Sequence, residues 1–219
     1  NEGHKNLMKL ISHAHNNHSY NNPIISFSDL KNFANDIIVI SGGKGSHIFE
    51  LIKREKISEA ENKLDNFLEI FKDDFILEVQ KTDREDEQEY FSKILPLAFS
   101  KSIPLVATND VLFSEANDFD IHETKVCINT GKTLNDPNRE KIFSREQYFK
   151  SSSDMVDIFK DYSELIGNTN EIAKKCNVSL HSSSYFLPEY PVPQEHNFDS
   201  FLRDLAHKKL KIHIKKYNE

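Results

Sequence analysis

Three short apolar segments, each followed by a turn and an amphipathic helix pattern, constrain the fold of this chain most. The segments are residues 37–40, 75–79 and 104–108. Short apolar runs bounded by turn residues are typical of strands that are buried on both faces. Repeated strand–helix units favour a parallel sheet with right-handed crossovers. The sequence therefore predicts an α/β fold with its functional residues after the carboxyl ends of the strands.

Helices are predicted between and after these strands. Ser58 and Glu61 have the spacing of a capping box, so we expect a helix to begin at Ser58 and to end before Asp73. A helix over 119–129 should end at Gly131. The other predicted helices are 46–53, one that opens in the charged stretch 83–89, 144–149, 153–159, 162–175 with Asn177 as its C-cap, and 199–217.

Length and charge limit the classes of protein that fit. The 219 residues suffice for one core with an extension, and no apolar run is long enough to span a bilayer. The first residue is not Met, so we expect a piece of a longer protein. Cys127 and Cys176 are too few for a disulfide framework or a zinc site, which favours a reducing cytoplasm. The net charge of −7 argues against a main DNA-gripping surface.

Four polar segments are weak candidates for sites. His13, His15 and His18 are expected at a helix end and in a surface loop, because residues two apart on a helix do not face each other. The segment 41–46 lacks the ending of a phosphate-binding Walker loop, so its glycines indicate a tight turn. Asp118 is expected to be the N-cap of the helix at 119–129 rather than a catalytic acid. The basic stretch 208–216 could contact nucleic acid, although a solvated helix face is the usual explanation.

Asp110 is the most informative single candidate. It follows the third predicted strand, where a ligand or an acid/base carboxylate would lie. The pair Asn109-Asp110 is equally typical of a loop. From the residues alone, we predict an α/β domain with a poorly equipped site.

Several segments in fixed order and spacing carry a specific resemblance. They are Gly3-His4-Lys5-Asn6-Leu7 with Leu10-Ile11-Ser12, Ile40-Ser41-Gly42-Gly43, Pro104-Leu105-Val106-Ala107-Thr108-Asn109-Asp110-Val111, His122-Glu123 with Ile128, Thr130-Gly131-Lys132-Thr133-Leu134 and Asp136-Pro137, Asn168-Thr169 with Glu171-Ile172-Ala173 and Cys176-Asn177-Val178, and Tyr185-Phe186-Leu187-Pro188. Together they resemble the alpha subunits of bacterial DNA polymerase III, in particular the proteobacterial branch.

The resemblance implies a PHP domain, a distorted parallel β/α barrel, over residues 1–185, without the first strands and their HxH metal motif. Residues 186–219 would be a Pro-rich linker and a helix that leads into the polymerase palm. The palm aspartates would lie outside this chain, so no catalytic residue is assigned here. The resemblance implies Mg²⁺ for the parent polymerase and no cofactor for this segment.

Members of the family with an intact PHP site use it for metal-dependent phosphoester cleavage. Asp110 falls at the position of an acidic ligand in that site. Leu112 stands where a His is expected, Gly43 where a Cys is expected at or beside it, and Thr82 near the place of another His. An aliphatic side chain cannot replace an imidazole ligand. The resemblance therefore predicts a vestigial metal site.

The resemblance also predicts the role of this segment. We expect a non-catalytic scaffold that docks the separate proofreading exonuclease subunit in the cytoplasm, alongside other holoenzyme subunits and primer-template DNA bound by the parent. The alternatives are an active phosphoesterase with 3′–5′ exonuclease activity and a DNA-contacting module. Because a barrel without its first strands exposes unpaired edges, we expect the isolated segment to fold poorly or to self-associate.

Overall fold

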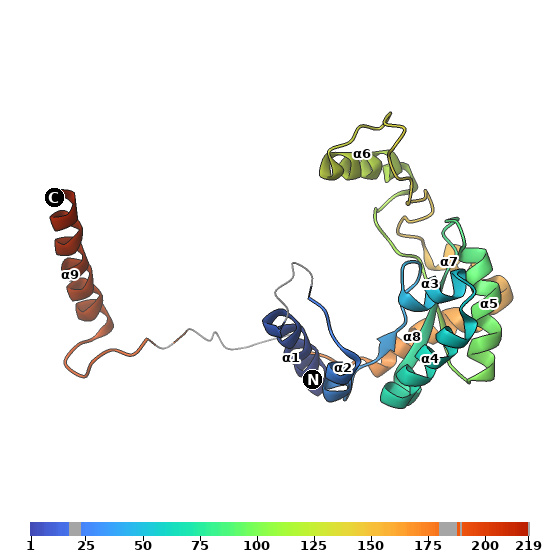
Figure 1. The fold of residues 1–219 in the computed structure, drawn as a ribbon, viewed down its shortest axis with the longest axis horizontal. Helices are drawn as coiled ribbons and strands as arrows, with labels where there is room; N and C mark the ends of the chain where they lie inside the picture. Colours follow the sequence, from blue (N-terminus) through green and yellow to red (C-terminus); the bar gives the residue numbers. More distant parts are fainter. Residues whose placement is uncertain (18–22, 180–187, 189, 219) are drawn as a thin grey trace. The chain divides into compact units, whose positions relative to one another are not determined.

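The computed structural model describes residues 1–17, 23–179, 188 and 190–218. The chain divides into two compact units, Asn1–Ser179 and Leu180–Glu219. The boundary expected at residue 186 lies outside the described residues. The helices of the first unit (Figure 1) are α1 (Glu2–Asn17), α2 (Phe27–Phe33), α3 (His47–Lys53), α4 (Ile57–Phe71), α5 (Glu87–Ser100), α6 (Phe119–Thr130), α7 (Ser152–Ile158) and α8 (Ser163–Lys175).

The sheet is parallel and has the strand order β1-β2-β3, which confirms the predicted α/β class. The strands are β1 (Val39–Ile40), β2 (Phe75–Gln80) and β3 (Leu105–Thr108). β1 is therefore shorter than the predicted 37–40. The pairs Val39–Phe75 and Leu77–Leu105 fix the register, so all three strands end at the same edge of the sheet.

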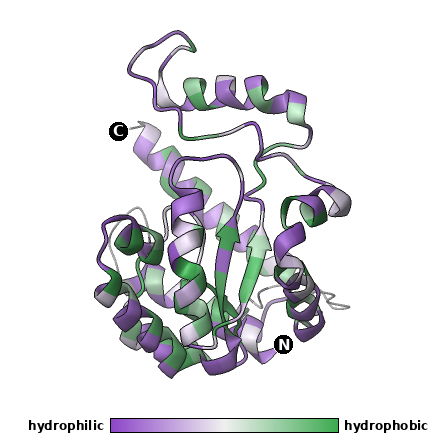
Figure 2. Ribbon diagram, turned by 90° about the vertical axis from the view of Figure 1, so that its right-hand side faces the viewer, coloured by the Kyte–Doolittle hydropathy of each residue, from purple (hydrophilic) through white to green (hydrophobic). Residues whose placement is uncertain are grey.

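The core lies between the sheet and its helices. Phe75, Leu77 and Val79 alternate along β2 and are each 0% exposed. They join a buried cluster that includes Leu64 of α4 and Ile94 of α5, also at 0%. Figure 2 shows the strands among the helices, and α3 packs on α4 and α5. Burying these apolar side chains is the main favourable term in holding the strand ends in place.

The starts of α3 and α4 differ in how they are capped. Ser46 is the N-cap of α3, and its hydroxyl accepts a hydrogen bond from the Phe49 amide at 3.1 Å. The capping box expected at Ser58 is wrong. The chain turns at Glu55, which has a positive φ of 57°, and Lys56 takes the N-cap position without a side-chain hydrogen bond. Ser58 therefore already lies inside α4.

The predictions for the ends of α6 and α8 have different outcomes. Gly131 ends α6 in the left-handed region, as predicted. Asp118 occupies the predicted N-cap position of α6 but makes no side-chain cap hydrogen bond, because its carboxylate accepts from the Glu115 amide at 3.0 Å and closes a short 3-10 turn. The C-cap of α8 is Cys176 in an extended conformation, not Asn177.

The predicted helix over 144–149 is also wrong. Tyr148 forms a parallel bridge with Phe113. The Leu112 amide donates to the Gln147 carbonyl at 2.8 Å, and the Phe149 amide donates to the Phe113 carbonyl at 3.0 Å. These long-range pairings satisfy the backbone groups that a helix would otherwise use.

The second unit contains one described helix, α9 (Phe198–Asn218), close to the predicted 199–217. In the extended, Pro-rich segment predicted before it, residues 185–187 lie outside the described residues, and residues 188 and 191–193 belong to no helix or strand. Among the helices of the described residues, none has the length and apolar character needed to cross a membrane.

Candidate functional site

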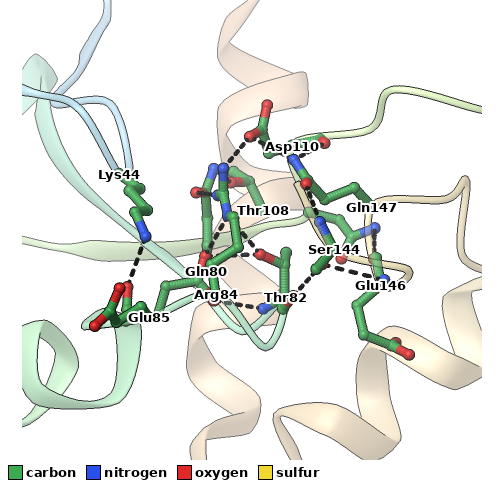
Figure 3. Close-up of polar contacts among 12 residues, drawn as sticks. Lys44, Gln80, Thr82, Arg84, Glu85, Thr108, Asp110, Ser144, Glu146 and Gln147 are labelled. Carbon is green, nitrogen blue, oxygen red and sulfur yellow. Dashed lines mark hydrogen bonds and ion pairs between the residues drawn. The ribbon is translucent and has the colours of Figure 1, made fainter. Parts of the chain in front are cut away.

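The residues singled out by sequence lie at the common carboxyl edge of the sheet (Figure 3). Gly43 follows β1, Thr82 follows β2 and Asp110 follows β3. Thr82 and Asp110 are labelled in Figure 3. Thr82 is 0% exposed, whereas the Asp110 side chain is 39% exposed. Leu112 also follows β3, and it is 39% exposed. The parallel register therefore brings the loops that carry Thr82 and Asp110 together.

An arginine that the sequence did not single out occupies the centre of this edge. The Arg84 side chain is only 9% exposed. Its Nη1 lies 2.7 Å from Asp110 Oδ2 and its Nη2 donates to Gln80 Oε1 at 2.7 Å. Its Nε contacts Glu87 Oε1 and Thr82 Oγ1, each at 2.9 Å. The planar guanidinium thus joins residues that follow two different strands (Figure 3).

Glu87 holds the loop after β2 in the shape that positions Arg84. The Thr82 amide donates to Glu87 Oε2 at 2.6 Å, and the Thr82 hydroxyl donates to Oε1 at 2.7 Å. Between them, Asp83 and Asp86 adopt positive φ angles of 56° and 70°. The Glu87 side chain is 7% exposed, so its charge depends on Arg84 for compensation.

A second layer of amides and hydroxyls surrounds the guanidinium. Gln80 Nε2 donates to Glu78 Oε1 at 2.9 Å and contacts Thr108 Oγ1 at 3.1 Å. The Thr108 hydroxyl also donates to Glu78. These contacts fix the Gln80 amide so that its oxygen faces Arg84. β2 and β3 are therefore joined at their ends by side chains as well as by the sheet.

Gln147 closes the site from a distant segment. It is 0% exposed, and its Nε2 donates to Asp110 Oδ2 at 2.9 Å. The nearby Ser144 hydroxyl donates to the Thr82 carbonyl. Because the Leu112 amide pairs with the Gln147 carbonyl, the stretch around 144–147 covers the strand ends. The same Asp110 oxygen is thus bonded by both a guanidinium and an amide.

Close approach of the backbone explains the glycine after β1. A Cβ atom on Gly43 would lie 2.2 Å from Gln80 Oε1, far inside van der Waals contact. Any side chain at this position, a cysteine included, would displace Gln80 from Arg84. Gly42 and Gly45 have φ angles of 80° and 92°, which supports the turn interpretation of this segment over a phosphate loop.

The residues at this edge do not fit a metal cluster. A fixed guanidinium repels a cation at the place where the vestigial ligands converge, and Asp110 Oδ2 already has two donors. In the described part of the chain, no three His, Cys, Asp or Glu side chains are arranged so that they could hold a metal ion. Burial raises the pKa of the nearby Tyr90 phenol, which keeps it protonated and unsuited to bind a cation.

The other candidates lie elsewhere. His13 and His15 belong to the end of α1, and His13 Nε2 is 3.0 Å from Asp29 Oδ1. His18 falls outside the described residues.

In α6, Glu123 is buried against Arg139, and this hydrogen bond raises the pKa of the guanidinium. Cys127 is buried in the same helix and Cys176 is exposed, both as free thiols.

The first part of the chain matches a known protein family. The family model described as "PHP domain" matches residues 1–82. With the parallel sheet and its helices, this match agrees with the partial PHP-type barrel that the sequence predicted.

The alpha subunit of DNA polymerase III from Pseudomonas aeruginosa is 39% identical over 203 residues, which is 92% of this chain and 17% of that protein. The Escherichia coli K12 subunit is 38% identical over 192 residues, 87% of this chain and 17% of that protein. The Haemophilus influenzae subunit is 37% identical over 191 residues, 87% of this chain and 16% of that protein. The chain is thus similar, over most of its length, to proteobacterial DNA polymerase III alpha subunits, and it spans about one sixth of their length.

Proposed function

We propose that this chain is part of a replicative DNA-directed DNA polymerase, the alpha subunit of a DNA polymerase III, which acts in the cytoplasm. Its similarity to such subunits over 92% of its length supports this assignment. Nucleotide addition, with Mg²⁺ as the cofactor, belongs to other parts of that protein. No residue of the present chain is given a role in that step, and the segment itself needs no cofactor.

Within that polymerase, the PHP segment acts as a non-catalytic scaffold. The observation that carries this proposal is the Arg84 guanidinium at the strand ends, bonded to Asp110, Gln80, Thr82 and Glu87. Metal-dependent phosphoester cleavage needs an open metal site with room for water or substrate. A nine-tenths buried guanidinium with four partners leaves no such position, and it links the strands instead.

The partners proposed for the scaffold are the proofreading exonuclease subunit and other subunits of the holoenzyme, with primer-template DNA bound by the parent polymerase. Large apolar side chains on the surface of the first unit are compatible with protein contacts. Ile128 of α6 is 77% exposed, and Phe149 is 74% exposed. Exposed apolar groups of this kind commonly mark interaction sites when they cluster.

The test uses the full-length polymerase, with metal analysis and a 3′–5′ exonuclease assay on mismatched primer-template. We expect polymerase activity, no stoichiometric metal in the PHP domain and no cleavage attributable to it. Asp110→Asn should leave the exonuclease background unchanged, as should Asp120→Asn, a matched control at an acid that is 75% exposed. Metal-dependent cleavage that Asp110→Asn abolishes and Asp120→Asn preserves would establish the active phosphoesterase instead.

Docking needs a separate measurement. The full-length polymerase should co-elute with the purified exonuclease subunit in size-exclusion chromatography. A polymerase lacking residues 1–179 should lose that complex while binding primer-template as before. Retention of the complex by the truncated protein would refute the docking role and leave the polymerase assignment intact.

A further inference from the structure

Positive charge is concentrated in the second half of α9. Residues 206–217 contain five lysines and neither Asp nor Glu, although the rest of the chain has more acidic than basic side chains. Lys208, Lys209, Lys211, Lys215 and Lys216 are all exposed. The first half of the helix differs, because Asp199 and Asp204 accompany Arg203 there. A chain with a net charge of −7 thus carries a local basic surface.

Helical spacing arranges these lysines in two rows. Lys208, Lys211 and Lys215 follow each other at three and four residues, so they lie on one face. Lys209 and Lys216 are seven residues apart and form a neighbouring row about 100° around the axis. At 1.5 Å per residue, the first row extends over about 10 Å. We call these five residues the lysine face.

Several lysines of the first unit have an acidic partner. In the first unit, Lys5 pairs with Glu2, Lys31 with Glu69 and Lys174 with Glu171, each at 2.7–2.8 Å. Within the described residues, no ion pair involves Lys208, Lys209, Lys211, Lys215 or Lys216. Unpaired ammonium groups in rows attract a polyanion more strongly than groups already neutralised by a neighbour.

We propose that the lysine face binds the phosphate backbone of duplex DNA. This inference rests on the polymerase assignment for the choice of polyanion. Duplex DNA carries one negative charge per about 1.7 Å of axis, so a 10 Å row can meet several phosphates. Lysine acts as a point charge and no Arg, Asn or Gln lies among residues 206–217, so contacts would fix position without reading sequence.

An anionic membrane surface is the main competing partner for a basic helix with apolar residues. Two features favour DNA. Ile212 lies between the two lysine rows, so the positive surface is not separated cleanly from the apolar residues. Residues 206–217 also contain neither Trp nor Phe, the aromatic residues that commonly anchor interfacial helices.

The test is a salt titration of binding. The 219-residue chain is mixed with a fluorescein-labelled 30-base-pair duplex of arbitrary sequence, and anisotropy gives the affinity between 50 and 200 mM NaCl. The test variant replaces Lys208, Lys211 and Lys215 with Gln. The control variant replaces Lys5, Lys31 and Lys174 with Gln, which removes the same charge from exposed positions elsewhere.

Each phosphate contact contributes about 0.9 to the slope of log affinity against log salt, so the test variant should lose about 2 to 3 from the slope. The control should keep it, and a duplex of different sequence should bind equally well. Equal losses in both variants, no DNA binding by the unchanged chain, or binding only to phosphatidylserine vesicles would each overturn the proposal. Polymerase activity of the parent protein is measured separately and tests the proposed function. The salt slope tests only the role of the lysine face.

Discussion

Replacement of Arg84 by methionine probes the centre of the candidate site. Methionine keeps an unbranched apolar stem of similar reach but removes every donor. Glu87, with a side chain 7% exposed, would lose its compensating charge, and the Gln80 oxygen would lose its donor. Asp110 is 39% exposed and can be solvated again by water, so the loss of its ion pair contributes less to the fall in the free energy of unfolding. Breaking one side of a buried ion pair costs about 3–5 kcal/mol, and we expect about 3 kcal/mol here.

The assay is urea and thermal unfolding of the 219-residue chain, followed by circular dichroism. A cooperative transition of the monomeric, unchanged chain is required for the comparison, and it would contradict the expected poor folding of the isolated segment. For a protein of this size, a loss of about 3 kcal/mol corresponds to a fall of about 6–12 °C in Tm. Arg145→Met is the matched control, because Arg145 is 59% exposed, pairs with the exposed Asp120 and lies over the Phe119 ring. Arg145→Met should lower the free energy of unfolding by no more than about 1 kcal/mol.

A double variant separates the loss of charge compensation from the loss of packing. Adding Glu87→Gln to Arg84→Met removes the unpaired carboxylate and should recover part of the lost stability. If Arg84→Met lowers the free energy of unfolding no more than Arg145→Met does, the Arg84 guanidinium does not organise the strand ends. If the double variant is less stable than Arg84→Met alone, charge compensation is not the reason for the effect.

Gly43→Ala should lower the free energy of unfolding by about 1–3 kcal/mol, because its Cβ would push Gln80 aside. Gly167→Ala in α8, with open space around the added Cβ, should be neutral or stabilising in the same urea assay, and equal effects would contradict the clash. Ser46→Ala should lower the free energy of unfolding by about 1 kcal/mol, because α3 loses its N-cap hydrogen bond. Ser58→Ala should cost little, since no cap bond exists there, and thermal unfolding compares the two.

The sequence predicted the elements that local patterns encode. Apolar runs ending in turn residues located β2 and β3, and the left-handed glycine at 131 located the end of α6. The periodicity of apolar residues does not specify where a chain enters a helix. That is why Ser58, a good cap by composition, lies inside α4 after the turn at Glu55.

The candidate site was predictable only in part. The position of Asp110 after a strand pointed to the correct edge of the sheet. Arg84 and Glu87 were missed because they belong to the charged stretch 83–89, whose pattern is the same as that of a solvated helix start. Gln147 was missed because it meets Asp110 from 37 residues away, across a segment whose predicted helix does not form. No local pattern encodes such a contact.

The arrangement of charges explains why the edge is well suited to a scaffold. Glu78, Glu87 and Asp110 bring three carboxylates to the ends of two strands, and such a group would repel itself without a cation. Arg84 supplies one positive charge covalently and pairs with Glu87 and Asp110, whereas Glu78 accepts from Gln80 and Thr108. A covalently held cation cannot activate water as a metal does. The proposed scaffold role therefore predicts that removal of Arg84 lowers the free energy of unfolding before it changes any activity.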